Sequence, residues 1–166
     1  MKIKISNLPE GIHKFELTKN VSELNLDEQF RDEIKLNCKV DKSLHQIVVD
    51  CQLKINAVFS CDRCNKKYND ILETNFEIVF LYDKNIEGNN NTDIKYITRN
   101  LENLDLTKEV IDYTYLSVPM KKLCDDNCKG LCPQCGANLN IKKCNCETDS
   151  VNPVWEKLIS LKGKLN

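Results

Sequence analysis

The chain has 166 residues, of which 41% are hydrophobic, and a formal net charge of −1. This length and composition can furnish one domain with an ordinary hydrophobic core, which excludes a chain too small to fold without a metal or a disulfide. The near-zero charge argues against a protein that binds nucleic acid electrostatically over its whole surface.

We expect no secretion signal in the first twenty residues. Charged and apolar residues alternate there, so the apolar core of about 7 to 15 residues that a secretion signal requires is missing. No run along the chain approaches the ~18 apolar residues of a membrane span. We therefore expect a cytoplasmic protein without a membrane partner, in a compartment that keeps thiols reduced.

The first half of the chain predicts β-strands. Residues 2–17 hold apolar residues around the turn signal Pro9-Glu10-Gly11, which suggests two strands. Residues 33–40, 47–59 and 72–82 alternate apolar and polar side chains, as strands with one buried face do. They predict an antiparallel sheet, with a barrel-like closure as one form that it could take.

Two cysteines belong to this alternation. Cys38 falls on the apolar face of residues 33–40, and Cys51 falls on the apolar face of residues 47–59. Because free cysteine behaves as a small hydrophobic residue, we expect both to be core residues with free thiols rather than ligands or reactive groups.

Two short helices are predicted in the second half. A polar, asparagine-rich loop at Lys84–Asp93 precedes the first, which we place near residues 106–116 with Asp105 as its N-cap. Asn152-Pro153 resembles the cap and first turn of the second helix, and the apolar residues that follow keep helical spacing.

The predicted fold class is therefore α+β. Residues 1–119 are expected to form an antiparallel β domain that includes the first helix. Residues 120–166 are expected to form a cysteine-rich, zinc-bound segment, with a C-terminal helix packed on the same domain.

Eight of the ten cysteines lie at spacings typical of metal ligands. In a reducing compartment such clusters bind metal more often than they form disulfides. Four thiolates complete the tetrahedron of one structural Zn²⁺, so that eight cysteines suffice for two ions. The candidate ligands are Cys61, Cys64, Cys124, Cys128, Cys132, Cys135, Cys144 and Cys146.

These ligands divide most simply into two groups. The first group, which closes a long loop and should therefore stabilise the fold more, is Cys61, Cys64, Cys124 and Cys128. The second group, which is local in sequence and contains a CPQCG turn, is Cys132, Cys135, Cys144 and Cys146. A different division, in which Cys61 and Cys64 join Cys132 and Cys135, remains open.

The donor set favours structural over catalytic metal. No His, Asp or Glu recurs at ligand spacing around the cysteines, whereas catalytic zinc uses such ligands and leaves one position for water. An iron–sulfur cluster is an alternative, but the spacings differ from those of ferredoxins. The sequence shows no catalytic residues and no phosphate-binding loop for a small-molecule substrate.

Basic residues flank both sets of cysteines and are candidate nucleic-acid contacts. A loop clamped by metal could present them to phosphates at little ordering cost. The alternative is a solvated surface that offsets the charge of the thiolates. The candidates are Arg63, Lys66, Lys67, Lys121, Lys122, Lys129, Lys142 and Lys143.

The chain resembles the YceD family, the large ribosomal RNA subunit accumulation proteins of bacteria and plastids. The motifs that carry the resemblance are the Cys61-Asp-Arg-Cys64 pair after a long strand, the stretch from Val118 to Cys124, the run from Cys128 to Asn140, and the closing Cys144-x-Cys146. Some family members lack the last four thiols, and this favours the first division of the ligands.

The resemblance implies a non-enzymatic cytoplasmic factor needed for accumulation of 23S ribosomal RNA, through its processing or through assembly of the large subunit. Its expected partners are precursor ribosomal RNA or a large-subunit assembly intermediate, and ribosomal proteins or assembly factors. One alternative is a zinc-ordered adaptor that binds protein without touching RNA. A less favoured alternative is a dithiol oxidoreductase that uses Cys61 and Cys64, since that pair lies between antiparallel strands rather than at a helix N-terminus.

Overall fold

The computed structural model describes residues 1–82 and 94–146. The chain divides into two compact units. Unit 1 comprises Met1–Ser60 and Lys67–Lys122, and unit 2 comprises Cys61–Lys66 and Leu123–Asn166. Unit 2 is therefore assembled from two stretches that are distant in sequence.

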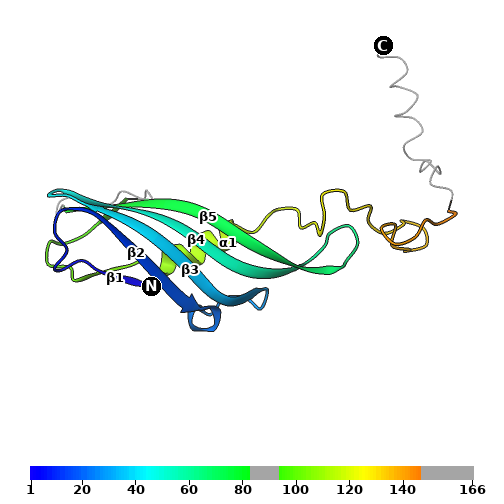
Figure 1. Ribbon diagram of the computed structural model, residues 1–166, viewed down its shortest axis with the longest axis horizontal. Helices are drawn as coiled ribbons and strands as arrows, with labels where there is room; N and C mark the ends of the chain where they lie inside the picture. The colour runs from blue at the N-terminus through cyan, green and yellow to red at the C-terminus, as the bar shows by residue number, and fades with distance from the viewer. Residues whose placement is uncertain (83–93, 147–166) are drawn as a thin grey trace, which may run out of the picture. The chain divides into compact units, whose positions relative to one another are not determined.

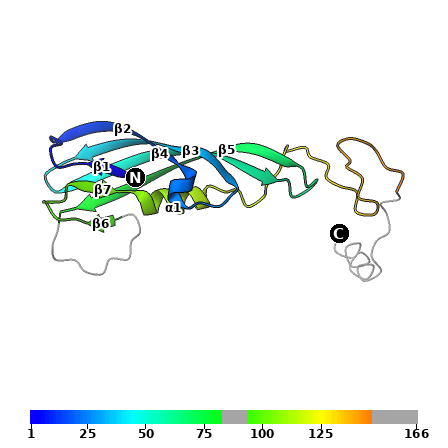
Figure 2. The ribbon, with the colours of Figure 1, turned by 90° about the horizontal axis from the view of Figure 1, so that it is seen from below.

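Unit 1 contains a five-stranded sheet with the strand order β2-β3-β4-β5-β6 (Figures 1 and 2). Neighbours are antiparallel, except that β6 pairs parallel with β5. The bounds are β2 Gly11–Asn20, β3 Phe30–Lys42, β4 Gln46–Ser60, β5 Lys67–Leu81 and β6 Ile94–Tyr96.

Four smaller elements complete the described part of unit 1. Strands β1 (Lys2–Lys4) and β7 (Asn103–Asp105) form a separate antiparallel pair. The short 3-10 helix η1 (Val21–Leu24) follows β2, and the helix α1 (Thr107–Leu116) follows β7. None of the helices in the described part of the chain has the length and apolarity needed to cross a membrane.

The predicted alternation of buried and exposed side chains is confirmed. In β4 every second residue from Ile47 to Phe59 is buried. The sheet is wider than predicted because β2 pairs with β3 over its full 10 residues and β6 adds an edge strand. The barrel-like form is wrong for the described residues, since the strand order is linear and the sheet stays open.

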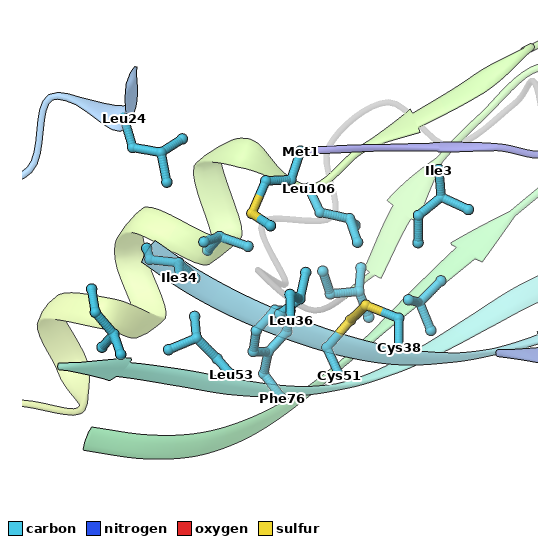
Figure 3. Packing of buried hydrophobic residues seen from close by; sticks show 14 of the residues in the cluster. Met1, Ile3, Leu24, Ile34, Leu36, Cys38, Cys51, Leu53, Phe76 and Leu106 are labelled. Atoms are coloured by element: carbon cyan, nitrogen blue, oxygen red, sulfur yellow. A yellow bond between two sulfur atoms is a disulfide. The ribbon is translucent and has the colours of Figure 1, made fainter. Parts of the chain in front are cut away.

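The buried face of the sheet packs against α1 and against β1 and β7 (Figures 2 and 3). Leu106 and Val110 are completely buried, and the ring of Tyr113 stacks on that of Phe76 with centroids 4.4 Å apart. Full burial of one large apolar side chain contributes about 1.5–3 kcal/mol. The burial of Leu106 and Val110 and the stacking of Tyr113 on Phe76 therefore hold the helix against the sheet.

The first predicted helix is confirmed, within one residue of its predicted start. Asp105 Oδ1 accepts hydrogen bonds from the backbone N–H of Thr107 at 3.0 Å and from its hydroxyl at 2.6 Å. Leu106, and not Asp105, is the residue directly before the first turn. The prediction that Asp105 is the N-cap is therefore wrong by one residue. Asp105 lies just before the N-cap, and its side chain still accepts the hydrogen bond from the N–H of the first helical residue. The predicted loop at 84–93 and the predicted second helix both lie outside the described residues. The packing of residues 120–166 on the β domain stays a prediction.

Cys38 and Cys51 are buried as predicted, but the prediction of free thiols is wrong. The two residues face each other in the register of β3 and β4, and their sulfurs form a disulfide in the core (Figure 3). Directly opposed residues on one face of an antiparallel pair have neighbouring Cβ atoms. The alternation in the sequence assigns each cysteine to a face, but it does not say which residues oppose each other.

Candidate metal centres

The turn between β4 and β5 positions the first two candidate ligands. The Cys61 N–H donates to the Lys66 carbonyl at 2.9 Å, and the Asn65 N–H donates to the Cys61 carbonyl at 2.9 Å. Asn65 has a φ of 60°, a left-handed conformation that asparagine tolerates better than most residues. The turn therefore carries Cys61 and Cys64 on a tightly bonded backbone.

A second turn positions the other two ligands of the first group. Asp125 Oδ1 accepts from the Asn127 N–H at 2.8 Å, and the Asp125 carbonyl accepts from the Cys128 N–H at 3.0 Å. An aspartate that bonds the backbone two residues later forms an Asx turn. This turn lies between Cys124 and Cys128.

Arg63 joins the two turns. Its Nη1 donates to the Cys128 carbonyl at 2.7 Å and to the Asp126 carbonyl at 3.3 Å, and its own carbonyl accepts from the Leu131 N–H at 3.0 Å. Gly130 has a φ of 77°, and a Cβ there would lie 3.0 Å from the Arg63 carbonyl oxygen. The close approach of the two stretches therefore requires glycine at this position.

The sulfur atoms of the first group have the spacing of a tetrahedral site. All four Sγ atoms lie within 4.8 Å of one another, with Cys61 Sγ and Cys128 Sγ 3.8 Å apart and Cys64 Sγ and Cys124 Sγ 3.6 Å apart. A Zn–S distance of about 2.3 Å gives a tetrahedron with edges of ~3.8 Å. The first group therefore fits a four-coordinate ion.

The second group is built on a short hairpin. The Gly136 N–H donates to the Cys132 carbonyl at 2.9 Å, and the Cys132 N–H donates to the Ala137 carbonyl at 2.8 Å. Gly136 takes a φ of 70°, a left-handed conformation that glycine adopts without steric cost. The four Sγ atoms of Cys132, Cys135, Cys144 and Cys146 also lie within 4.8 Å of one another.

The structure thus groups the cysteines by the first of the two divisions, and both groups lie wholly within unit 2. They differ in exposure, because three ligands of the first group are buried whereas Cys135 of the second group is exposed. The identity of an ion, and its binding, remain predictions.

Each group contains one thiol with a lowered pKa and another thiol with a raised pKa. Hydrogen bonds from backbone N–H groups, first from Cys124, lower the pKa of Cys61 to about 6. Backbone bonds, first from Cys135, likewise lower the pKa of Cys132 to about 6. The pKa of Cys124 is raised to about 12, first by its hydrogen bond with Cys64.

The second group repeats this arrangement, since the pKa of Cys146 is raised to about 12, first by its hydrogen bond with Cys135. One thiol of each group therefore ionises readily, whereas another resists because negative charge would accumulate among the sulfurs. A divalent cation removes this obstacle, because metal ligation favours the thiolate form of every ligand.

The predicted nucleic-acid contacts fall in both units. Lys67, Lys121 and Lys122 belong to unit 1, and the other five belong to unit 2. The Lys122 ammonium lies 5.1 Å from the centroid of the Phe59 ring. The Arg63 guanidinium also donates to two backbone carbonyls through Nη1. The eight nucleic-acid contacts, Arg63 included, stay predictions.

Sequence reasoning missed two residues that hold the centres together, Arg63 in its structural role and Asn140. Asn140 Nδ2 donates to Cys128 Sγ at 3.3 Å. The Asn138-x-Asn140 pattern after the CPQCG turn is a turn signal. This pattern does not show that the Asn140 amide will donate to the Cys128 sulfur, because the two residues belong to different turns.

Comparison with known proteins places the chain in context. The family described as "Large ribosomal RNA subunit accumulation protein YceD" matches residues 49–162. The "Large ribosomal RNA subunit accumulation protein YCED homolog 1, chloroplastic" of Arabidopsis thaliana is 32% identical over 39% of this chain and 20% of its own length. The protein of the same name in Zea mays is 39% identical over 36% of this chain and 20% of its own length.

An uncharacterized protein of Mycobacterium tuberculosis is 25% identical over 78% of this chain and 62% of its own length. The chain thus spans from a fifth to about three fifths of the length of these relatives. No solved structure matches it.

Proposed function

The chain belongs to the YceD family, and from this premise we propose that it is a non-catalytic factor in the accumulation of large-subunit ribosomal RNA, with two structural zinc ions in unit 2. The observation that carries the proposal is the pair of four-cysteine groups, each with its sulfur atoms within 4.8 Å of one another. The relatives in Arabidopsis thaliana and Zea mays are named for this role.

The donor chemistry supports zinc in a structural role. Among the described residues each group consists of cysteines alone. Four thiolates saturate a tetrahedral ion and leave no position for a water molecule or a substrate. Bound zinc would supply positive charge that holds the two turns of the first group and the hairpin of the second group in place.

The burial of Cys61 and Cys64 weighs against the oxidoreductase alternative. Their exposed fractions are 2% and 6%, whereas a catalytic thiolate must be reached by its substrate. Both sulfurs also belong to a four-thiol group. Stable zinc at these thiols would withdraw them from exchange chemistry.

Contact with RNA would be local rather than long-range. The described part of unit 2 holds five basic and three acidic residues, a balance of +2. Because each Zn²⁺ with four thiolates adds −2, two ions would bring this part to about −2. Exposed lysines can still bind individual phosphates, and Lys129, Lys142 and Lys143 are exposed on the loops that metal would hold.

The adaptor alternative also has support. Ile141, which precedes two of these lysines, is 82% exposed, and Leu131 is 40% exposed. Contiguous exposed apolar patches are typical of surfaces that bind protein, and the adaptor would use these two side chains as part of such a patch. A charge balance near −2 is compatible with a protein partner as well.

Elemental analysis of the reduced protein comes first, with about two zinc ions per chain expected. Cosedimentation with precursor particles of the large subunit then tests the proposed role in ribosomal RNA accumulation. The wild type is compared with a variant in which Lys129, Lys142 and Lys143 are replaced by Glu. We expect this variant to bind at least tenfold more weakly, because a single charged hydrogen bond to phosphate contributes ~1.5 kcal/mol or more before screening.

The matched control replaces three exposed lysines of unit 1 by Glu, namely Lys14, Lys35 and Lys39. It changes the net charge of the chain by the same amount as the first variant does. Equal losses in both variants would argue against a specific contact. Association that survives nuclease treatment, with no effect of either variant, would support the adaptor. Protein without bound metal would contradict the proposed zinc centres.

A further inference from the structure

We infer that Asn140 couples the two cysteine groups, so that metal bound to the second group strengthens metal binding by the first. This inference rests on the proposed metal sites. It goes beyond them because two separate structural ions would otherwise bind independently.

The side chain of Asn140 joins a ligand of the first group to the loop that lies between two ligands of the second group. Its Nδ2 donates to Cys128 Sγ at 3.3 Å and to Asn138 Oδ1 at 2.9 Å, while its Oδ1 accepts from the Lys129 N–H at 2.7 Å. Both hydrogens of the amide are thus used, and its oxygen holds the residue next to a ligand of the first group.

The position of Asn140 is set by the loop of the second group. Asn138 Oδ1 accepts from the Asn140 N–H at 3.0 Å, and the Asn138 carbonyl accepts from the N–H groups of Ile141 and Lys142 at 3.0 and 3.1 Å. This turn lies between Cys135 and Cys144. A metal that binds both cysteines therefore closes a ring that contains Asn140.

The same loop is joined to the segment that carries Cys128. The Leu139 N–H donates to the Gly130 carbonyl at 2.9 Å, and Leu131 forms an antiparallel bridge with Asn138. Ordering the loop thus brings the Asn140 amide to the Cys128 sulfur with little further loss of conformational freedom.

The hydrogen bond from Asn140 favours the metal-bound form of the first group. An N–H donor stabilises the thiolate relative to the thiol, and residues that bond metal ligands change metal affinity by about 10- to 100-fold. When the second group is empty, its loop must be ordered at the expense of conformational entropy before the amide can donate. The coupling is reciprocal, so metal in the first group must strengthen binding by the second by the same factor.

The test measures zinc affinity by competition with a chromophoric chelator, using the full chain with its eight candidate ligands as free thiols. Three proteins are compared: the wild type, a variant with the first group replaced by Ser, and a variant with the second group replaced by Ser. We expect the wild type to bind two ions with an overall constant about tenfold larger than the product of the two single-group constants.

Asn140→Ala should reduce this ratio to about one. Asn140→Asp retains an acceptor for the Lys129 N–H but puts a carboxylate near the thiolate, and should weaken the first group further. Asn145→Ala, an exposed position between Cys144 and Cys146, is the control and should keep the ratio of the wild type. Absorption of the Co²⁺-loaded proteins checks that each remaining group stays tetrahedral.

Two bound ions with a ratio near one in the wild type would overturn the coupling while leaving the proposed zinc centres intact. A ratio that survives Asn140→Ala would show that the residue does not carry it. Failure of the wild type to bind two ions would overturn the proposed centres themselves, and the coupling with them.

Discussion

The Arg63 guanidinium donates to the backbone carbonyl of Cys128 at 2.7 Å, so that a residue inside one cysteine pair holds the backbone of the other. We expect Arg63→Ala to weaken zinc binding by the first group about tenfold, because this bond orients the turn that carries Cys128. Zinc affinity is to be measured in the variant whose second group is replaced by Ser. Lys66→Ala, in the same turn, is the matched control. Equal affinities of Arg63→Ala and Lys66→Ala would contradict this role.

Zinc binding by the first group should depend more steeply on pH below about 6 than above it. The pKa of Cys61 in the metal-free group is lowered to about 6, so this thiol still carries its proton below that pH. Metal must then displace one more proton. The logarithm of the zinc affinity should rise with pH throughout, with a slope greater by about one below pH 6. A slope that does not change there would show that Cys61 has no such acidity.

Asp105 should contribute to resistance against acid. Hydrogen bonds from Thr107, first from its hydroxyl, lower the pKa of Asp105 from 3.8 to about 2. The folded state therefore binds this proton less tightly than the unfolded state does. The stabilisation is fully present above about pH 4 and is lost as pH falls toward 2.

The measurement compares Asp105→Asn with the wild type by denaturant unfolding at pH 6 and pH 2.5. We expect the wild type to be more stable at pH 6 and the difference to shrink at pH 2.5. The side chain is 50% exposed, so the effect should be less than ~1 kcal/mol after screening by solvent. A difference that stays constant between the two pH values would point to lost packing instead.

The core disulfide gives a prediction of thiol number and of stability. Unfolded, metal-free protein prepared without reductant should show eight reactive thiols, and ten after reduction. Cys38 and Cys51 enclose a short loop, with a sequence separation of 13, whose closure contributes roughly 3 kcal/mol. Reductant should lower the unfolding free energy of the wild type by about this amount and leave a Cys38→Ala, Cys51→Ala double variant unchanged. Ten thiols before reduction would contradict the disulfide.

The strands were predictable because each buries one face. Alternation from Ile47 to Phe59 is a property of one segment, and it requires no knowledge of the partner. The register between segments is not encoded in that pattern. For this reason the sequence assigned Cys38 and Cys51 to the core and still missed that they face each other.

The candidate ligands were also predictable, since their spacing is local, whereas the residues that orient them were not. The bond from Arg63 to the Cys128 carbonyl joins residues 65 positions apart. The bond from Asn140 to the Cys128 thiol depends on how two loops approach each other. Sequence spacing identifies the residue types that can bind a metal, but only the fold shows which neighbouring donors they meet.

The discontinuous composition of unit 2 has a consequence for the order of events during translation. Cys61 and Cys64 are synthesised early, before β5 and α1, but the first group lacks its last ligand until Cys128 has been added. By then every strand of the main sheet has been made. All strands of the main sheet are therefore synthesised before the last ligand of the first group. The sheet can thus form in the nascent chain before the first group binds a metal.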